Sequence, residues 1–158
     1  IRVLSQSFGS PTIPGRFILP AVKELGIGFV PYSPLGRGFL TGKYTSNDDF
    51  SDKDFRKKNA RFLPENLNHN IRLLTTIEPI AQKYQATMGQ IALAWLLAQY
   101  DKLVPIPGTK KLSYLIENAK AADIVLEEDD VKFLNHLPNE IQVQGNRYSD
   151  EGMKGVNA

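Results

Sequence analysis

Residues Tyr32–Lys43 combine residue types that suit the binding of a phosphate-bearing ligand. The glycines of this stretch allow a ligand to approach the backbone closely, and Ser33 supplies a hydroxyl group. Arg37 carries a fixed positive charge that pairs with phosphate, and the ring of Tyr32 offers a flat surface to a heteroaromatic ring. The alternative is a glycine-rich turn with a core tyrosine and a solvated arginine, and spacing alone does not separate the two interpretations.

A second segment, Pro105–Asn118, places a small residue, a hydroxyl and two lysines where a helix is expected to begin. Backbone N–H groups, the helix dipole and the lysines would converge there, which favours an anion such as phosphate. Glu117 and Asn118 follow about two helical turns later, within reach of a base attached to that phosphate. The alternative is that Thr109 is an ordinary helix N-cap beside two exposed lysines.

Other candidate motifs do not fit their patterns. Five residues instead of four separate Gly36 from Gly42, and a tyrosine follows Lys43, so this stretch is not a phosphate-binding P-loop. His69 and His136 have no second histidine or cysteine at metal-ligand spacing. We expect both to be packing or solvated side chains, and the sequence predicts no metal site.

Each candidate binding segment follows a short apolar run. Ile27–Tyr32 and Leu103–Pro107 are bounded by turn formers, which is typical of buried strands in a parallel sheet. Ligands of parallel α/β folds bind at the carboxyl ends of strands, so this order supports binding at both segments.

Helical spacing of apolar residues predicts five helices: Phe17–Leu25, Pro64 to Tyr84, a helix capped by Thr87 that carries Trp95, one through Leu115–Ala119, and one from Glu127 to Leu137. Pro79 should bend or locally break the second helix, and Trp95 should lie in the core. Residues 33–62 form a long connection of the kind that is functional or mobile. Residues 138–158 are expected to form a tail or docking loop, and the order of elements favours an α/β fold.

The composition excludes several classes of function. The 158 residues are 42% hydrophobic and 23% charged, as in ordinary soluble proteins, and the net charge of +2 is too small to argue for nucleic-acid binding. The absence of cysteine excludes disulfides, thiolate metal sites and cysteine nucleophiles. No apolar run approaches the roughly 18 residues of a membrane-spanning helix. We therefore expect a soluble, cytoplasmic protein that binds neither nucleic acid nor membrane.

Taken together, the two segments resemble the C-terminal half of an aldo-keto reductase. The similar stretches are residues 32–42 and 106–110, continuing through Ala60–Asn66, Gln90–Trp95, Glu117–Asn118 and Asn146–Tyr148. The resemblance covers residues 17–158, whereas residues 1–16 are irregular and atypical of the family. It implies the C-terminal part of a TIM (β/α)8 barrel, with Ile27–Tyr32 and Leu103–Pro107 as its seventh and eighth strands. Such a barrel typically needs about 250 residues, so the barrel is expected to be incomplete in this chain.

The resemblance also implies an NADPH-dependent oxidoreductase that reduces aldehydes or ketones, its small-molecule carbonyl substrates, to alcohols. Tyr32 would stack on the nicotinamide. The pyrophosphate would be lined by Ser33, Pro34, Leu35 and Arg37, the adenosine 2′-phosphate by Gly108, Thr109 and Lys110, and the adenine by Glu117 and Asn118. Tyr114 stands where many relatives present Arg or Gln near the 2′-phosphate.

No catalytic residue is assigned, because the family's acid tyrosine and its supporting residues lie in the first half of the barrel, upstream of this chain. One alternative is a catalytically inactive, truncated or regulatory protein that binds only cofactor or a partner. Another is a helical module that uses lysines, Lys102 among them, to bind acidic partners. A barrel without its first strands should leave open sheet edges and uncovered apolar faces, so we expect the isolated chain to be marginally stable, aggregation-prone or dependent on a partner.

Overall fold

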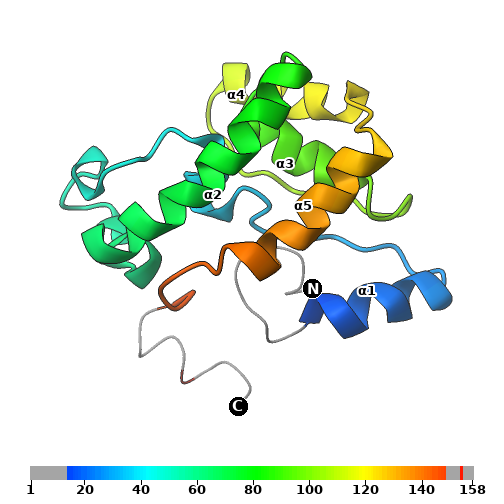
Figure 1. Ribbon diagram of the computed structural model, residues 1–158, viewed down its shortest axis with the longest axis horizontal. Coiled ribbons are helices and arrows are strands. Elements are labelled where there is room, and N and C mark those ends of the chain that lie inside the picture. Colours follow the sequence, from blue (N-terminus) through cyan, green and yellow to red (C-terminus); the bar gives the residue numbers. More distant parts are fainter. Residues whose placement is uncertain (1–13, 149–153, 155–158) are drawn as a thin grey trace.

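The computed structural model describes residues 14–148 and residue 154 (Figure 1). Its α-helices are α1 (Pro14–Glu24), α2 (Pro64–Lys83), α3 (Met88–Leu97), α4 (Leu112–Ala119) and α5 (Glu128–Glu140). Short 3-10 turns are η2 (Gly36–Thr41), η3 (Asn47–Asp49), η4 (Phe55–Lys58), η5 (Ala60–Phe62) and η6 (Lys120–Asp123). The irregular segment expected over residues 1–16 lies largely outside the described residues, and its last three residues belong to α1. In the described part of the chain, no helix is both long and apolar enough to cross a membrane.

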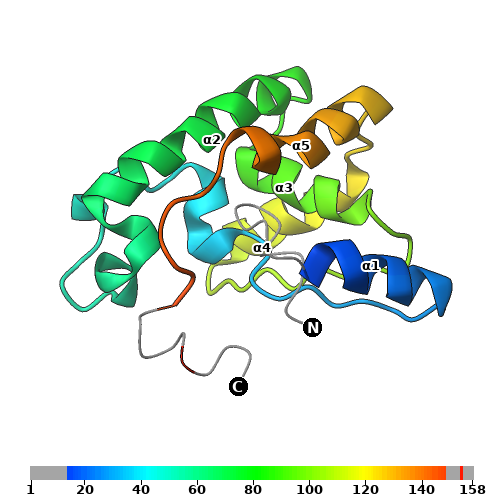
Figure 2. The ribbon, with the colours of Figure 1, turned by 60° about the horizontal axis from the view of Figure 1, so that its bottom comes forward.

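Helix α3 is the centre of the core, with α2, α4 and α5 around it (Figures 1 and 2). It begins with a reciprocal capping box, in which the side chains of Thr87 and Gln90 each accept from the other's backbone N–H. Apolar residues occupy all of its sides, and the run from Ile91 to Leu96 is buried. Trp95 lies in the core, as predicted, and its indole N–H donates to Asn135 on α5 at 2.9 Å.

Helix α2 packs Leu73, Ile77 and Ile80 against this core. Of the predicted bend or local break at Pro79, the break is wrong, since α2 continues through this residue. Pro79 and Thr75, whose carbonyl loses its helical N–H partner, both face outward, so water can satisfy that carbonyl.

The two predicted strands lie side by side in parallel, but only as isolated bridges. Phe29 pairs with Leu103 and Tyr32 with Ile106. The N–H of Phe29 donates to Lys102 at 2.8 Å, and the N–H of Val104 donates to Phe29 at 2.9 Å. Phe29 and Leu103 are buried, whereas the aliphatic side chains Ile27, Val30, Val104 and Ile106 are 39–58% exposed. No further strand flanks this pair among residues 14–148, so the pair forms little regular ladder and covers only part of its apolar surface there.

The connection after Tyr32 is packed against the rest of the chain, not extended into solvent. Its aromatic residues form a second small core, in which Phe50 stacks on Tyr44 at 4.9 Å between ring centroids and meets Phe62 edge to face at 5.3 Å. The Asn47 amide donates to the carbonyls of Lys57 and Phe62. The long connection expected to be functional or mobile therefore makes many contacts within itself.

Residues 141–148 run back across the start of α2. The buried side chain of Asn70 donates to the carbonyl of Gln144 at 3.1 Å and accepts from its N–H at 2.7 Å. His69 hydrogen-bonds the carbonyl of Gln142 at 3.0 Å. These contacts make this segment, here called the C-terminal strap, a docked part of the fold.

Gly145 is the position at which the strap tolerates no side chain. Its φ of +88° favours glycine, and a Cβ there would lie 2.7 Å from backbone atoms of Ala60. We predict that Gly145→Ala releases the strap and lowers the free energy of unfolding by about 2 kcal/mol. Amide hydrogen exchange at residues 142–148 should accelerate. Gly28→Ala is the matched control, because its Cβ would meet only an ordinary contact at 3.7 Å. Unchanged exchange in the strap of the Gly145 variant would contradict the prediction.

A second tertiary contact joins α5 to the end of α2. Lys83 Nζ lies 2.7 Å from a carboxylate oxygen of Glu127 and 2.8 Å from one of Asp130. The Tyr84 hydroxyl donates to Asp130 at 2.6 Å and accepts from the N–H of Glu127 at 2.7 Å. Hydrogen bonds from Lys83 and Tyr84 hold the pKa of Asp130 below its ordinary value of 3.8.

Because the folded pKa of Asp130 is depressed, its stabilising effect should be complete above about pH 4–5 and be lost as the pH falls through the folded value. We predict that Asp130→Asn lowers the free energy of unfolding at pH 7 by about 1 kcal/mol. The difference from wild type should shrink below pH 4, as measured by urea unfolding at several pH values. Asp129→Asn is the control, because that side chain is 96% exposed. A pH-independent difference would be inconsistent with this assignment.

Candidate functional site

The two candidate segments meet at one open cavity of about 480 Å³, within the usual size range of cofactor sites. Eight of the predicted cofactor residues line it: Ser33, Pro34, Leu35, Arg37, Gly108, Tyr114, Glu117 and Asn118. The other three, Tyr32, Thr109 and Lys110, are not among the described lining residues. The structure therefore brings together residues that lie more than 60 positions apart in the sequence.

The start of α3 positions both sides of this cavity. Gly89 lies close to the side chains of Leu35 and Thr41, so the η2 segment packs directly against the first turn of α3. On the other side, Thr87 Oγ1 donates to the carboxylate of Glu117 at 3.0 Å, and the amide of Gln90 donates to the Glu117 carbonyl at 2.9 Å. One capped helix end therefore fixes the spacing between the two segments.

The first segment follows an irregular backbone path. Ser33 and Arg37 adopt positive φ angles of 53° and 61°, a region that residues with a Cβ rarely occupy. The Thr41 hydroxyl donates to the Gly38 carbonyl at 2.6 Å, and the buried Leu40 anchors the turn in the core. Unusual backbone conformations at non-glycine residues cluster at binding sites, because the surrounding structure must enforce them.

Two cations in the cavity wall were not among the predicted site residues. Lys43 Nζ lies 3.9 Å from the ring centroid of Tyr114 and so links the two segments by a cation–π contact. Arg56 donates to the carbonyl of Arg37 at 3.1 Å and pairs with Asp54 at 2.6 Å, which raises the pKa of the Arg56 guanidinium. Lys43 could have been found from its place in the glycine-rich segment. Arg56 lies in a polar stretch without any local signal for binding.

The second segment differs from its prediction in where the helix begins. Helix α4 starts at Leu112, with Lys111 as the N-cap residue, so Thr109 is not the N-cap. The Thr109 hydroxyl instead accepts from the N–H of Lys111 at 3.2 Å in a local turn. The first turn of the helix therefore lies a few residues beyond the Gly-Thr-Lys sequence that was expected to receive its dipole.

Tyr32 lies beside the strap and not in the wall of the large cavity. Its hydroxyl is 2.9 Å from the hydroxyl of Tyr148, and the guanidinium carbon of Arg147 lies 4.6 Å from its ring centroid. The hydrogen bond with Tyr32, together with the nearby guanidinium groups of Arg147 and Arg37, lowers the pKa of Tyr148. The Tyr32–Tyr148 bond joins residues 116 positions apart in the sequence. The resemblance included Asn146–Tyr148, but none of these residues was among the predicted site residues.

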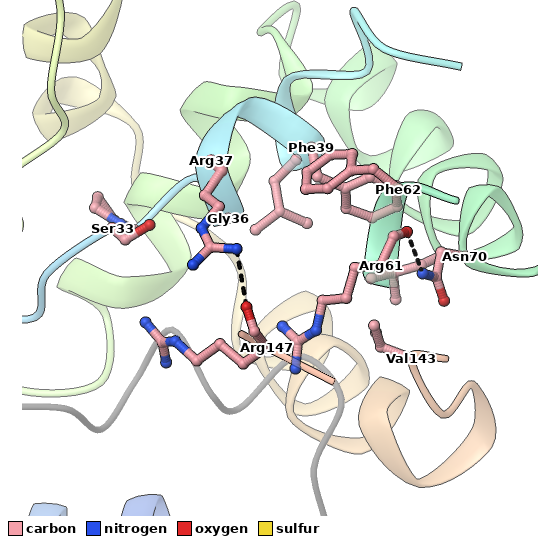
Figure 3. A pocket seen from close by; sticks show the side chains of 12 residues that line it. Ser33, Gly36, Arg37, Phe39, Arg61, Phe62, Asn70, Val143 and Arg147 are labelled. Carbon is pink, nitrogen blue, oxygen red and sulfur yellow. Dashed lines mark hydrogen bonds between the residues drawn. The ribbon is translucent and has the colours of Figure 1, made fainter. Parts of the chain in front are cut away.

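A second, smaller cavity of about 50 Å³ adjoins the first, and Figure 3 shows the side chains that line it. Ser33, Pro34 and Arg37 border both cavities. Arg37 donates to the carbonyl of Arg147 at 2.8 Å, and burial together with the charge of Arg147 lowers the pKa of Arg37. Arg61 and Arg147 complete the charged part of the smaller cavity.

The two histidines lie away from both cavities and contact main-chain carbonyls, His69 that of Gln142 and His136 that of Lys132. Among the described residues, no group of three or more His, Cys, Asp or Glu side chains is arranged to hold a metal ion.

Comparisons with known proteins agree with the resemblance noted in the sequence. Residues 10–138 match the sequence profile of the Aldo/keto reductase family. Aldo-keto reductase yakc [NADP(+)] of Schizosaccharomyces pombe is 47% identical over 131 residues, which cover 83% of this chain and 38% of the relative. Aldo-keto reductase str7 of Strobilurus tenacellus is 43% identical over 135 residues, or 85% of this chain and 40% of the relative. The chain thus spans about two fifths of the length of these curated relatives.

Comparison with solved structures also finds aldo-keto reductases and related enzymes with a similar fold. A thermostable aldo-keto reductase, Tm1743, matches with a TM-score of 0.53 and 32% identity over 76% of this chain and 33% of that structure. The glycerol dehydrogenase AKR11B4 of Gluconobacter oxydans matches with a TM-score of 0.69 and 22% identity over 80% of this chain and 38% of that structure. The observed helices and the parallel bridges correspond to part of a TIM barrel, as the resemblance predicted. The chain belongs to the aldo/keto reductase family.

Proposed function

We propose that this chain provides the NADPH-binding part of an oxidoreductase that reduces aldehydes or ketones to alcohols. The observation that carries the proposal is the large cavity, where the segments around Ser33 and Gly108 meet. Its wall combines cations, a flat aromatic ring and polar groups, which are the groups that a dinucleotide requires. The name of the fission-yeast relative, which specifies NADP(+), supports the same cofactor.

The residues present fit the parts of this cofactor. Arg37 and Lys43 provide positive charge for the pyrophosphate, and Arg56 adds a third cation to the same wall. Gly108 leaves open space where a Cβ would stand, so a phosphate can approach the backbone there. Glu117 and Asn118 would contact the adenine. When bound, NADPH supplies the hydride for carbonyl reduction.

Tyr32 would orient the nicotinamide by stacking. One face of its ring is already covered by the Arg147 guanidinium, and its hydroxyl is held by Tyr148. The nicotinamide would therefore stack on the opposite face, and the strap would hold the ring plane in position.

Because the chain spans about two fifths of the length of its curated relatives, a second candidate is a chain that binds cofactor without turnover. Mixing the purified chain with NADPH and an aldehyde panel distinguishes these candidates by NADPH oxidation.

Lys43 provides a direct test of the cofactor cavity. We predict that NADPH fluorescence increases on binding to the chain, and that Lys43→Met weakens the affinity about tenfold by removing one charge-assisted contact with phosphate. Lys53→Met is the matched control, because Lys53 is exposed and outside the cavity wall. Equal affinity in the two variants would show that the cofactor binds elsewhere.

Lys110 tests the proposed recognition of the 2′-phosphate. We predict that Lys110→Met weakens NADPH binding about tenfold and leaves NADH binding unchanged, because NADH lacks that phosphate. The preference of the wild type for NADPH over NADH should also decrease as salt is added, since Lys110 is exposed. Lys120→Met, at the other end of α4, is the control. A variant that lost affinity for both cofactors equally would refute the assignment to the 2′-phosphate.

A further inference from the structure

Three positively charged side chains line the smaller cavity. Arg37 reaches it from the η2 turn, Arg61 from the η5 turn and Arg147 from the C-terminal strap, so three guanidinium groups come from three separate segments (Figure 3). The other described lining residues are apolar, glycine, Ser33 or Asn70, and no carboxylate is among them.

The hydrogen bonds that hold two of these arginines do not neutralise their charge. Arg37 Nη1 donates to the Arg147 carbonyl at 2.8 Å, and Arg61 Nε donates to the Gly145 carbonyl at 3.2 Å. Both acceptors are neutral main-chain groups. A guanidinium has five N–H donors, so each of these two arginines retains donors beyond the one that fixes its position.

The electrostatic effect is clearest at Arg61. Burial, followed by the charges of Arg147 and Arg37, lowers the pKa of Arg61 to about 10. The pKa of Arg37 is lowered by burial and by Arg147 as well. Partly buried like charges destabilise one another, and a bound anion would offset the free-energy cost of both the burial and the repulsion.

The size and place of the cavity restrict the anion. A volume of about 50 Å³ suits a single carboxylate or phosphate group and is far too small for a dinucleotide. The cavity shares Ser33 and Pro34 with the large cavity, and Arg147 lies against Tyr32. An oxyanion bound here would therefore lie beside the cofactor cavity, across the Tyr32 ring from the proposed nicotinamide position.

We infer that the cavity formed by Arg37, Arg61 and Arg147 binds an oxyanion group of the substrate, so that the substrates are carbonyl compounds that carry a carboxylate or phosphate. This inference rests on the proposed function, because it places the anion relative to the nicotinamide. Arg61 is the most informative residue, since it borders only the smaller cavity and takes no part in the proposed binding of the cofactor.

The test compares two ligands of matched chain length, 5-oxopentanoate and pentanal, on the chain loaded with NADP+, in which no reduction can occur. Dissociation constants are measured by ligand-observed NMR. We expect 5-oxopentanoate to bind at least about tenfold more tightly than pentanal, and this preference to disappear in Arg61→Met. Arg61→Lys should retain part of the preference, which separates loss of charge from loss of fold. Arg72→Met, an exposed arginine on α2, should retain all of it.

The outcomes separate this inference from the proposed function. If NADP+ binds but the two ligands bind equally, or if the preference survives in Arg61→Met, the inference is overturned and the proposed function stands. Failure of NADP+ to bind would overturn the proposed function. In that case the same titrations without cofactor still measure whether 5-oxopentanoate binds more tightly than pentanal. Inorganic phosphate is the third ligand. Competition between phosphate and 5-oxopentanoate in the wild type supports one shared site, whereas simultaneous binding overturns the assignment to a substrate group.

Discussion

A helix that is apolar on every side has to be covered on every side, and in this chain that requirement organises both the fold and the site. Helix α3 is such a helix, and α2, α4, α5 and the η2 turn pack around it. Its first turn is fixed by the reciprocal bonds of Thr87 and Gln90, and the same side chains hold Glu117. The distance between the two halves of the large cavity thus depends on the burial of one helix.

The second organising contact is the docking of the C-terminal strap. Asn70 is almost fully buried, and it satisfies the backbone of Gln144 in both directions. Asn59 and Arg37 both donate to the carbonyl of Arg147. The strap has no regular secondary structure, and hydrogen bonds from these polar side chains hold it in place. They position Arg147 and Tyr148 beside Tyr32. The strap is thus held both through its main chain, at Gln144 and Arg147, and through the Tyr148 hydroxyl, which is 2.9 Å from that of Tyr32.

The local sequence pattern predicted which helices and strands form more accurately than the residues at which they begin and end. Apolar periodicity located the helices, and the capping box before α3 was legible in Thr87 and Gln90. The apolar runs that end in Tyr32 and Pro107 were recognised as parallel neighbours, although the structure forms only two bridges between them. The start of α4 was misplaced because Thr109 bonds within its own turn, and Pro79 was overestimated as a helix breaker because it faces solvent. The strap, Arg56 and Arg61 were not among the predicted site residues, although Arg61 and part of the strap lie in stretches that carry the resemblance. Each acquires its position through contacts between distant segments. Residue types at the two segments indicated a phosphate-bearing ligand, and the family resemblance specified the cofactor and the role of each residue. The charged cavity became visible only in three dimensions.

The position of Arg37 between two cavities has a thermodynamic consequence. Its single positive charge contributes to the potential in both, and its orientation is fixed by the bond to the strap. Two anions that shared this cation would compete for its donors and repel each other across it, so occupancy of one cavity would lower the affinity of the other. Such a coupling free energy is reciprocal: whatever factor the first ligand imposes on the second, the second imposes on the first. Antagonism between neighbouring anions would therefore follow from a shared arginine alone, without any change in the conformation of the barrel.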